Sequence, residues 1–467
     1  MKTMNKLLIG IYCMCAINQP IFAQEKKEVG SKLPNIVLIM ADDMGYECLG
    51  VNGSAEYKTP NLDILANKSI RFDHAFSQPL CTPSRVKIMT GKHNFRNYED
   101  FGFLNPNQET FANLLKNAGY ASCIAGKWQL NGNETNREGN QDNSRPNHFG
   151  FEEYCLWQLT HPRKDGERYA NPLITQNGKD LPRDQDAYGP DIFSNFVIDF
   201  IDRNAEKEKP FLVYYPMVLV HTPFVPTPDS PEWADPSRRY ENDTTYFADE
   251  VAYTDKIVGK IVTKLKEKGV WENTLLIFCG DNGTKSSVIT NTIYGGIVGG
   301  KGKTINTGNH VPMIMSWPDQ IRRGRLFPGV IDFSDILPTI ADVAQIDPSN
   351  YNVDGHSYMS ILNGSYEPVS KEVFIHYTPR KGKGSHGDRW VLNGEYKLYQ
   401  GGSFYNTLDD PDEQNPLGNI LTPFNQKIKE KFKKILESKE KEFPFQWNNK
   451  RFVPKEERIE VGGIIKS

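Results

Sequence analysis

Pro-Asn-Ile-Val-Leu-Ile-Met-Ala-Asp-Asp-Met-Gly, residues 34–45, is the stretch that decides the fold of this 467-residue chain. Residues 36–40 form a short apolar run, which is typical of a strand buried on both faces of a parallel sheet. Two carboxylates, Asp42 and Asp43, follow it directly. Adjacent carboxylates at the end of a buried strand repel each other unless a cation or hydrogen-bond donors compensate, so they are candidate metal ligands.

Short apolar runs and helix-like segments alternate along the chain. The further runs are residues 120–125, 211–215 and 275–279, and the helix-like segments are residues 110–118, 192–201 and 246–265. This rhythm predicts an α/β fold, with a mixed, mostly parallel sheet flanked by helices. Ligands bind beyond the carboxyl ends of the strands in such sheets. We expect one pocket to collect the polar residues that follow the runs: Asp42, Asp43, Lys127, His221, Asp281 and Asn282.

The pair Asp281-Asn282 follows the run at residues 275–279. An Asp-Asp pair alone is more often a helix cap or a turn than a metal site. A third carboxylate and an amide oxygen at the end of a second strand change that balance, because together they make four oxygen donors with no histidine or thiolate. Such a set favours Ca²⁺ or Mg²⁺ over zinc.

Residues 79–91 read Pro-Leu-Cys-Thr-Pro-Ser-Arg-Val-Lys-Ile-Met-Thr-Gly, a pattern too regular for an ordinary loop. Pro83 and the Ser84-Arg85 step predict the start of a helix, with Cys81 at its positive end. That end of a helix favours an anionic substrate.

The motif around Cys81 resembles the signature of the formylglycine-dependent sulfatases, which belong to the alkaline-phosphatase-like superfamily. The resemblance covers nearly the whole mature chain. It is carried also by residues 34–45, by Gly-Tyr-Ala-Ser-Cys-Ile-Ala-Gly-Lys-Trp at 119–128, by Lys301 after a Gly pair and by Asp-Ile-Leu-Pro-Thr at 335–339. It implies an alkaline-phosphatase-like fold and hydrolysis of sulfate monoesters. The expected export and the many aromatic and polar loop residues favour a sulfated carbohydrate as the substrate.

In that family the cysteine becomes formylglycine, whose hydrated aldehyde attacks the sulfur of the ester. The resemblance therefore implies that a formylglycine-generating or anaerobic sulfatase-maturating enzyme modifies Cys81, and that the cofactor is Ca²⁺ rather than Mg²⁺. The implied metal ligands are Asp42, Asp43, Cys81, Asp281 and Asn282. The implied catalytic residues are Arg85, which orients the formylglycine; Lys127, His221 and Lys301, which surround the sulfate; Asp281 as the base; and His221 as the acid.

Fixed positive groups suit this chemistry, because negative charge builds on the departing groups as a sulfate ester breaks. Taken singly, a lysine such as Lys127 is usually a solvated charge, and His221 before Thr-Pro could cap a turn. Their position within two signatures is what favours a catalytic role.

Two positions depart from the family's pattern. Gln129 follows Gly-Lys-Trp where relatives commonly have His, so it can bind substrate but cannot carry a proton at neutral pH. The loop at residues 306–312 lacks the Glu-Gly-Gly and Arg that relatives commonly show. Lys303 is an alternative to Lys301 at the sulfate. Further candidates for the wall of the substrate pocket are Trp157, His161, Arg163, His310, Arg380 and His386.

Two other functions stay open on the sequence alone. One is a phosphatase or phosphonate monoester hydrolase on the same scaffold. Its two-zinc forms need additional His and Asp ligands, and Asn282 after Asp281 argues for one metal. The other is a catalytically inactive glycan-binding relative, which the loss of a proton carrier at Gln129 would suit.

The rhythm changes near Glu372. Asn393-Gly394 between residues 389–392 and 395–399 is a strong hairpin signal, and residues 425–442 form a Lys/Glu-rich helix with one apolar stripe. We expect a catalytic domain at residues 25–371 and a smaller C-terminal subdomain, an antiparallel sheet with a helix, at residues 372–467.

The N-terminal apolar run, residues 7–17, is about half of the ~20 residues that a membrane span needs. It predicts a signal peptide at residues 1–24 and an exported, periplasmic or secreted protein without a stable membrane span. The net charge of −3 provides no broad basic footprint, so we expect no nucleic-acid partner. After removal of the expected signal peptide, an odd number of cysteines remains, and we predict no disulfide among them. These cysteines are Cys48, Cys81, Cys123, Cys155 and Cys279.

Overall fold

Four strands of the main sheet lie where the four apolar runs predict them. The computed structural model describes residues 32–161, 167–321, 323–379, 387–418 and 420–445. The expected signal peptide and three expected pocket residues, Arg163, Arg380 and His386, lie outside this part. The chain divides into two units, and the account below concerns the second, Leu33–Ser467. In the described part, no helix has the length and apolar character to cross a bilayer.

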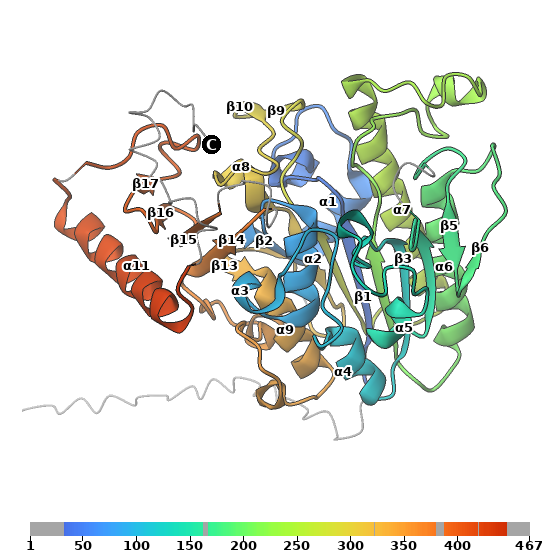
Figure 1. The fold of residues 1–467 in the computed structure, drawn as a ribbon, viewed down its shortest axis with the longest axis horizontal. Coiled ribbons are helices and arrows are strands. Elements are labelled where there is room, and N and C mark those ends of the chain that lie inside the picture. Colours follow the sequence, from blue (N-terminus) through green and yellow to red (C-terminus); the bar gives the residue numbers. More distant parts are fainter. Residues whose placement is uncertain (1–31, 162–166, 322, 380–386, 419, 446–467) are drawn as a thin grey trace, which may run out of the picture. The chain divides into compact units, whose positions relative to one another are not determined.

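Eleven strands of the described residues form the main sheet (Figure 1). They are β1 (Asn35–Ala41), β2 (Ile70–Phe76), β3 (Ala121–Lys127), β4 (Glu153–Trp157), β5 (Ile174–Gln176), β6 (Lys179–Asp180), β7 (Phe211–Pro216), β8 (Thr274–Gly280), β11 (His310–Val311), β12 (Met313–Ser316) and β13 (Arg325–Asp332). Their order is β11-β2-β12-β8-β1-β7-β3-β4-β5-β6, with β13 paired to β2. The central strands β8, β1, β7, β3 and β4 run parallel, whereas β5, β6, β11 and β12 pair antiparallel with their neighbours. The expected mixed α/β fold is confirmed.

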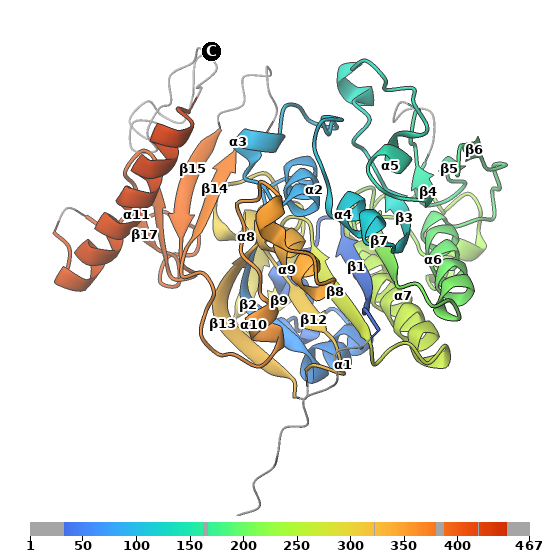
Figure 2. The same ribbon diagram turned by 90° about the horizontal axis from the view of Figure 1, so that it is seen from below.

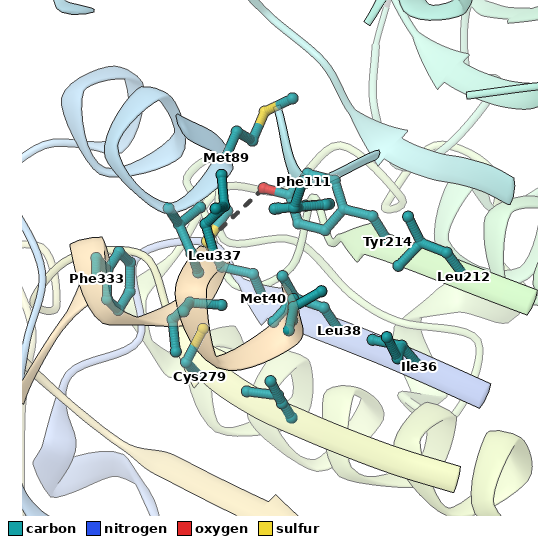
Figure 3. Close-up of a cluster of buried hydrophobic side chains, with 14 of the residues drawn as sticks. Ile36, Leu38, Met40, Met89, Phe111, Leu212, Tyr214, Cys279, Phe333 and Leu337 are labelled. Carbon is teal, nitrogen blue, oxygen red and sulfur yellow. Dashed lines mark hydrogen bonds between the residues drawn. The ribbon is translucent and has the colours of Figure 1, made fainter. Parts of the chain in front are cut away.

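The strand β1 is buried along its whole length, and its side chains alternate between two cores. Ile36, Leu38 and Met40 join the core on one face, together with Phe111 and Leu337 (Figure 3). The residues between them point to the opposite face and join the other core. This alternation is the period of two expected of a strand, and burial on both faces explains why every residue of the run is apolar.

Helices cover both faces of the sheet (Figure 2). The α-helices of the described residues are α1 (Pro60–Lys68), α2 (Cys81–Thr90), α3 (Asn94–Asn97), α4 (Phe111–Asn117), α5 (Arg145–His148), α6 (Gly189–Ala205), α7 (Phe247–Glu267), α8 (Asn306–Asn309), α9 (Ile336–Val343), α10 (Met359–Leu362) and α11 (Pro423–Glu442). Side chains of α2, α4, α9 and α10 belong to one core, and those of α1, α6 and α7 to the other. The three predicted helical segments correspond to α4, α6 and α7. Thr110 caps α4 with a capping box, which explains its sharp start.

A smaller antiparallel sheet follows the main one in the chain. Its strands, in spatial order, are β14 (Val373–Tyr377), β15 (Asp388–Leu392), β16 (Tyr396–Tyr399) and β17 (Phe404–Asn406). Gly394 makes the predicted hairpin turn with a φ of 92°. The helix α11 covers this sheet with the buried side chains of Phe432 and Leu436. The predicted antiparallel sheet and helix are therefore present, and the domain boundary at residue 372 stays a prediction.

Candidate active site

The parallel pairing of β1 with β8 brings four oxygen-bearing side chains together. Ala41 is paired with Gly280, so the residues that follow each strand lie side by side. The backbone N–H of Asp43 donates to Asp281 Oδ1 at 3.0 Å, and Asn282 Nδ2 donates to Asp43 Oδ1 at 2.9 Å. These side chains and that of Asp42 are fully buried. The tight turn after β1 puts Asp43 in the left-handed region, with a φ of 63°.

Cationic side chains from other elements reach the same carboxylates. Lys127, the last residue of β3, places its Nζ 2.6 Å from Asp42 Oδ2, and neither side chain is exposed. Lys301 Nζ lies 2.5 Å from Asp43 Oδ2. Buried charges are costly unless paired, and these two ion pairs offset much of the negative charge.

Cys81 lies beside the carboxylates. Its sulfur and carboxylate oxygens of Asp42 and Asp281 all lie within 4.8 Å of one another, a spacing that can hold a metal ion. Cys81 is the first residue of α2, as predicted, and its side chain is buried. Leu80, the residue before the helix, supplies no side-chain cap, and the positive end of the helix favours an anion.

Arg85 connects Cys81's helix to β3. Its Nη1 donates to the backbone carbonyl of Lys127 at 2.6 Å, and its Nε lies 3.8 Å from Asp281 Oδ2. The Nε and Nη2 groups are buried with no hydrogen-bond partner among the described residues. Unpaired buried donors cost free energy, so they indicate a place for a further acceptor.

The oxygen atoms of the cluster fit a hard cation. Asp42 Oδ1, Asp281 Oδ2 and Asn282 Oδ1 are buried and have no hydrogen-bond partner in the described part of the chain. A divalent cation would satisfy all three, and a donor set made of oxygens matches Ca²⁺ or Mg²⁺. Asp42, Cys81 and Asp281 lie close enough together to share one ion, and Asn282 adjoins them through its hydrogen bond to Asp43.

The buried carboxylates differ in their affinity for protons. Burial and the neighbouring Asp42 raise the pKa of Asp281 well above its usual range. Burial also acts on Asp42, but the nearby cationic groups, Lys127 first, outweigh it and hold the pKa of Asp42 well below its usual range. Asp281 therefore holds a proton more readily than Asp42 does, and a bound cation would displace that proton.

His221 is uncharged at neutral pH in this structure. Burial lowers the pKa of His221 to about 3, against the opposing effect of Asp43. The ring Nδ1 lies 2.7 Å from the carbonyl oxygen of Thr222, and Nε2 lies 3.8 Å from Asp43 Oδ2. An Nδ1–H tautomer donates to that carbonyl and leaves Nε2 facing the cluster. The predicted role as an acid would require a nearby anion, such as a bound sulfate, to raise this pKa.

Arg168 is a member of the cluster that the sequence did not indicate. Its Nη1 lies 4.0 Å from Asp42 Oδ2, and the side chain is 8% exposed. The guanidinium stacks on the ring of Trp157 at 4.2 Å. No motif or periodic pattern surrounds this residue, so only its place in the fold shows that it belongs to the site.

Three of the predicted pocket residues, Gln129, Trp157 and His161, line one cavity of about 130 Å³. The other lining residues are Gly102, Asn131, Asn133, Glu134 and Gln158. Gln129 follows β3 with a φ of 50°, and its Nε2 donates to Glu134 Oε1 at 2.7 Å. His161 Nε2 lies 2.9 Å from Asp180. The structure thus gathers these residues around a space next to Lys127.

Lys303 and His310 lie elsewhere. Lys303 is exposed, whereas Lys301 forms the ion pair with Asp43, so the structure favours Lys301 as the lysine of the site. His310 stacks on Tyr46, with ring centroids 4.2 Å apart, and its Nε2 lies 2.7 Å from a backbone carbonyl oxygen. His310 does not line the cavity of Gln129, Trp157 and His161, and its place in the substrate pocket stays a prediction. The five cysteines of the described residues are all buried and free.

Known proteins resemble this chain in sequence and in fold. The sequence model of the family described as Sulfatase matches residues 34–346. Human arylsulfatase A is 29% identical over 416 residues, which cover 81% of this chain and 77% of that protein. N-acetylgalactosamine-6-sulfatase of the dog, Canis lupus familiaris, is also 29% identical, over 71% of this chain and 66% of the relative, just under two thirds of its length.

A solved structure extends the likeness. The crystal structure of Ps i-CgsB superposes with a TM-score of 0.72 and 26% identity, and the match covers 87% of this chain and 92% of that one. The same protein has been solved in complex with k-i-k-neocarrahexaose. The common architecture is the alkaline-phosphatase-like fold.

Proposed function

This chain belongs to the sulfatase family, whose members are sulfuric ester hydrolases, and we propose that it hydrolyses sulfate monoesters of a sulfated carbohydrate, through a formylglycine made from Cys81 and a bound Ca²⁺ ion. One observation carries the proposal. The sulfur of Cys81 lies within 4.8 Å of the carboxylates of Asp42 and Asp281. Cationic side chains surround this group, so a sulfate placed there would meet a metal ion, a nucleophile position and fixed positive charge together.

Formylglycine supplies a hydrated aldehyde, a nucleophile that an unmodified cysteine cannot provide in this reaction. Cys81 is 2% exposed, so a modifying enzyme could not reach its sulfur in the folded protein. We therefore expect the formylglycine-generating or anaerobic sulfatase-maturating enzyme to act on the chain before it folds. Arg85, with its unpaired buried Nε and Nη2, would orient the modified side chain.

Ca²⁺ supplies a Lewis acid that draws charge from the sulfate oxygens when it is bound. Asp42, Asp43, Asp281 and Asn282 would hold it, since three of these residues carry buried oxygens without a partner. A carboxylate whose proton a bound cation has displaced into solvent is ionised and can accept a proton, so Asp281 is the residue that we assign as base.

Two lysines and one histidine would hold the sulfate. Lys127 and Lys301 form ion pairs with Asp42 and Asp43, and each can offer its remaining N–H donors to the substrate. His221 faces the cluster through Nε2 and would become a proton donor once the anion raises its pKa. Removing one such donor costs about 3 kcal/mol of transition-state stabilisation in comparable sites.

The relatives support a carbohydrate substrate. One is an N-acetylgalactosamine-6-sulfatase by name, and another was solved with k-i-k-neocarrahexaose. The proposal includes export to the periplasm or the medium by the predicted signal peptide at residues 1–24. It also includes a catalytic domain at residues 25–371 and a C-terminal subdomain at 372–467. Such a protein would meet polymeric sulfated glycans outside the cell.

The test is production of the chain together with a formylglycine-generating enzyme, followed by intact-mass analysis and assays on an aryl sulfate and the matching aryl phosphate. We expect formylglycine at position 81, metal-dependent release of sulfate and a much slower reaction with the phosphate. A Cys81→Ala variant serves as the unconverted control. Faster cleavage of the phosphate would support a phosphatase or phosphonate monoester hydrolase. A converted, calcium-loaded protein that cleaves no sulfate ester would support an inactive glycan binder and refute the proposal.

A further inference from the structure

The smaller antiparallel sheet has two faces that pack against different parts of the protein. Along β16, Tyr396 and Leu398 join the core under α11. Lys397 and Tyr399 point to the opposite face, as the strand period of two requires. Tyr399 belongs there to a core that includes Phe76, the last residue of β2. The face turned away from α11 therefore packs against the end of a main-sheet strand.

A buried ion pair lies on this second face. Lys397 Nζ lies 2.8 Å from Glu413 Oε1, and neither side chain is exposed. The hydroxyl of Tyr399 donates to the other oxygen of the same carboxylate. An ion pair in such a place often stabilises a fold no better than apolar side chains of similar volume. What else the pair binds is therefore the guide to its role.

The pair binds the loop that carries Lys301. Lys397 Nζ donates to the backbone carbonyl oxygen of Thr304. The hydroxyl oxygen of Tyr399 lies 3.2 Å from the same carbonyl oxygen and 3.2 Å from Thr304 Oγ1. Two side chains of β16 thus meet the backbone three residues beyond Lys301, and Glu413 holds both of them.

The turn at residues 301–304 is also fixed on its other side. The backbone N–H of Lys301 donates to the carbonyl of Thr284 at 2.9 Å, and that of Gly302 donates to the carbonyl of Pro79 at 2.8 Å. These two acceptors lie in the segments after β8 and before α2, which also carry the metal-ligand candidates. The Gly302 carbonyl accepts a bond of 3.2 Å from the hydroxyl of Tyr377 on β14. The turn is therefore held between the active-site segments and the smaller sheet.

The position of this turn decides where the Lys301 ammonium group lies. Lys301 Nζ is 2.5 Å from Asp43 Oδ2, so a shift of the turn would move the charge relative to the carboxylates. Gly302 has no side chain to pack, and Lys303 is exposed. At these two positions the backbone hydrogen bonds, rather than side-chain packing, keep the turn in place.

We propose that the buried pair Lys397–Glu413 positions Lys301 for catalysis by holding the Thr304 carbonyl against the smaller sheet. The inference rests on the proposed function, in which Lys301 holds the sulfate, and adds two positioning residues to that site. Glu413 acts at one remove, since its two oxygens orient Lys397 and Tyr399. The smaller sheet thus contributes to the reaction through a backbone turn.

The test removes the pair without leaving a buried charge unpaired. The variant Lys397→Met/Glu413→Gln loses both charges, and the glutamine keeps an acceptor for Tyr399. We expect kcat/KM for an aryl sulfate to fall by about 10–100-fold, because a shift of ~1 Å in a positioned group costs up to about 10²-fold. In a Lys301→Met background the same double change should cost less than about twofold, since the group that it positions is then absent. Tyr399→Phe removes one hydroxyl and should show the same dependence on Lys301 with a smaller loss, which keeps the inference testable if the double variant does not fold.

Phe432→Ala is the matched control. Phe432 is buried on the face of the smaller sheet that α11 covers, so its loss weakens the same sheet from the other side. This variant should leave kcat/KM within about twofold of the wild type. Hydrogen exchange followed by mass spectrometry adds a readout that needs no activity. The amides of residues 301–304 should exchange several-fold faster in the double variant and at the wild-type rate in Phe432→Ala.

If the wild-type protein cleaves no sulfate ester, the proposed function fails, and hydrogen exchange alone decides whether the pair holds the turn. The inference is overturned if exchange at residues 301–304 is unchanged in the double variant, or if Phe432→Ala accelerates it equally. It is also overturned if the double change lowers kcat/KM as much in the Lys301→Met background as in the wild type.

Discussion

Replacing Lys127 by methionine tests how the cluster balances charge. Lys127 Nζ lies 2.6 Å from Asp42 Oδ2, and both side chains are fully buried. The Lys127→Met variant keeps most of the side-chain volume and leaves a buried carboxylate without its closest cation. Breaking a buried ion pair in this way costs about 3–5 kcal/mol of the free energy of unfolding. We expect a loss of that size in the metal-free protein.

Calcium should reduce the loss, because the missing ammonium group no longer competes with the metal for Asp42. Each tenfold gain in Ca²⁺ affinity returns about 1.4 kcal/mol when the ion is in excess. The variant should therefore lie closer to the wild type in calcium than in EDTA. Its kcat/KM for an aryl sulfate should still fall by about 10²–10³-fold, because one positive group is missing from the transition state.

The assay is urea unfolding followed by tryptophan fluorescence, in EDTA and in calcium, with aryl sulfate kinetics on the same preparations. Lys303→Met is the matched control. That side chain is exposed, so its stability should stay within about 0.5 kcal/mol of the wild type. A Lys127→Met deficit that is as large in calcium as in EDTA would refute the reasoning, since the lysine would then help to hold the metal rather than compete with it.

Three further predictions follow from other parts of the structure. Burial and the neighbouring Asp42 raise the pKa of Asp281, so protons compete with the metal for its carboxylate. The affinity for Ca²⁺ should therefore increase with pH, and binding of Ca²⁺ should release protons. Calorimetry in two buffers of different ionisation enthalpy measures the protons exchanged, and proton uptake on binding would contradict this prediction. Phe432 of α11 is fully buried against the smaller sheet, so Phe432→Ala should lower the free energy of unfolding, measured in urea, by about 3–5 kcal/mol. A loss below about 1 kcal/mol would show that the helix contributes little. A Cβ at Gly126 would lie 2.2 Å from a carbonyl oxygen of β7, whereas one at Gly119 meets nothing within 4 Å, and both have positive φ. Gly126→Ala should therefore destabilise the protein by more than the ~1–2 kcal/mol of backbone strain expected for Gly119→Ala, and equal urea midpoints would disprove the close approach.

The local pattern of the chain predicted most of the fold. The apolar run of β1 lies at the centre of the sheet, buried on both faces as its composition indicated. The hairpin at Gly394 and the apolar stripe of α11 were equally readable, because turn residues and side-chain periodicity report local conformation and burial directly. Helix ends were less exact. The predicted segment at residues 192–201 extends to Gly189–Ala205 in α6, since polar residues at both ends carry no periodic signal.

The ligand cluster was predictable for a related reason. Asp42 and Asp281 each follow a buried run, and parallel strands bring their carboxyl ends to one edge, so order along the chain implied proximity in space. The same reasoning placed Lys127, at the end of β3, near these carboxylates. It said nothing about whether Lys301 or Lys303 turns toward the carboxylates, because that choice depends on the path of a loop after a Gly pair.

By itself, then, the sequence determined the α/β architecture, the position of Cys81 at a helix start and the residues that meet at the strand ends. Only the tertiary structure decided that Arg168 stacks on Trp157 beside Asp42, and that Glu134 and Gln129 share a cavity. Arg168, Gln129 and Glu134 lie in irregular segments that follow β4 and β3 and carry no repeating pattern. The path of such segments is set by the way they pack against the rest of the fold, which side-chain periodicity does not encode.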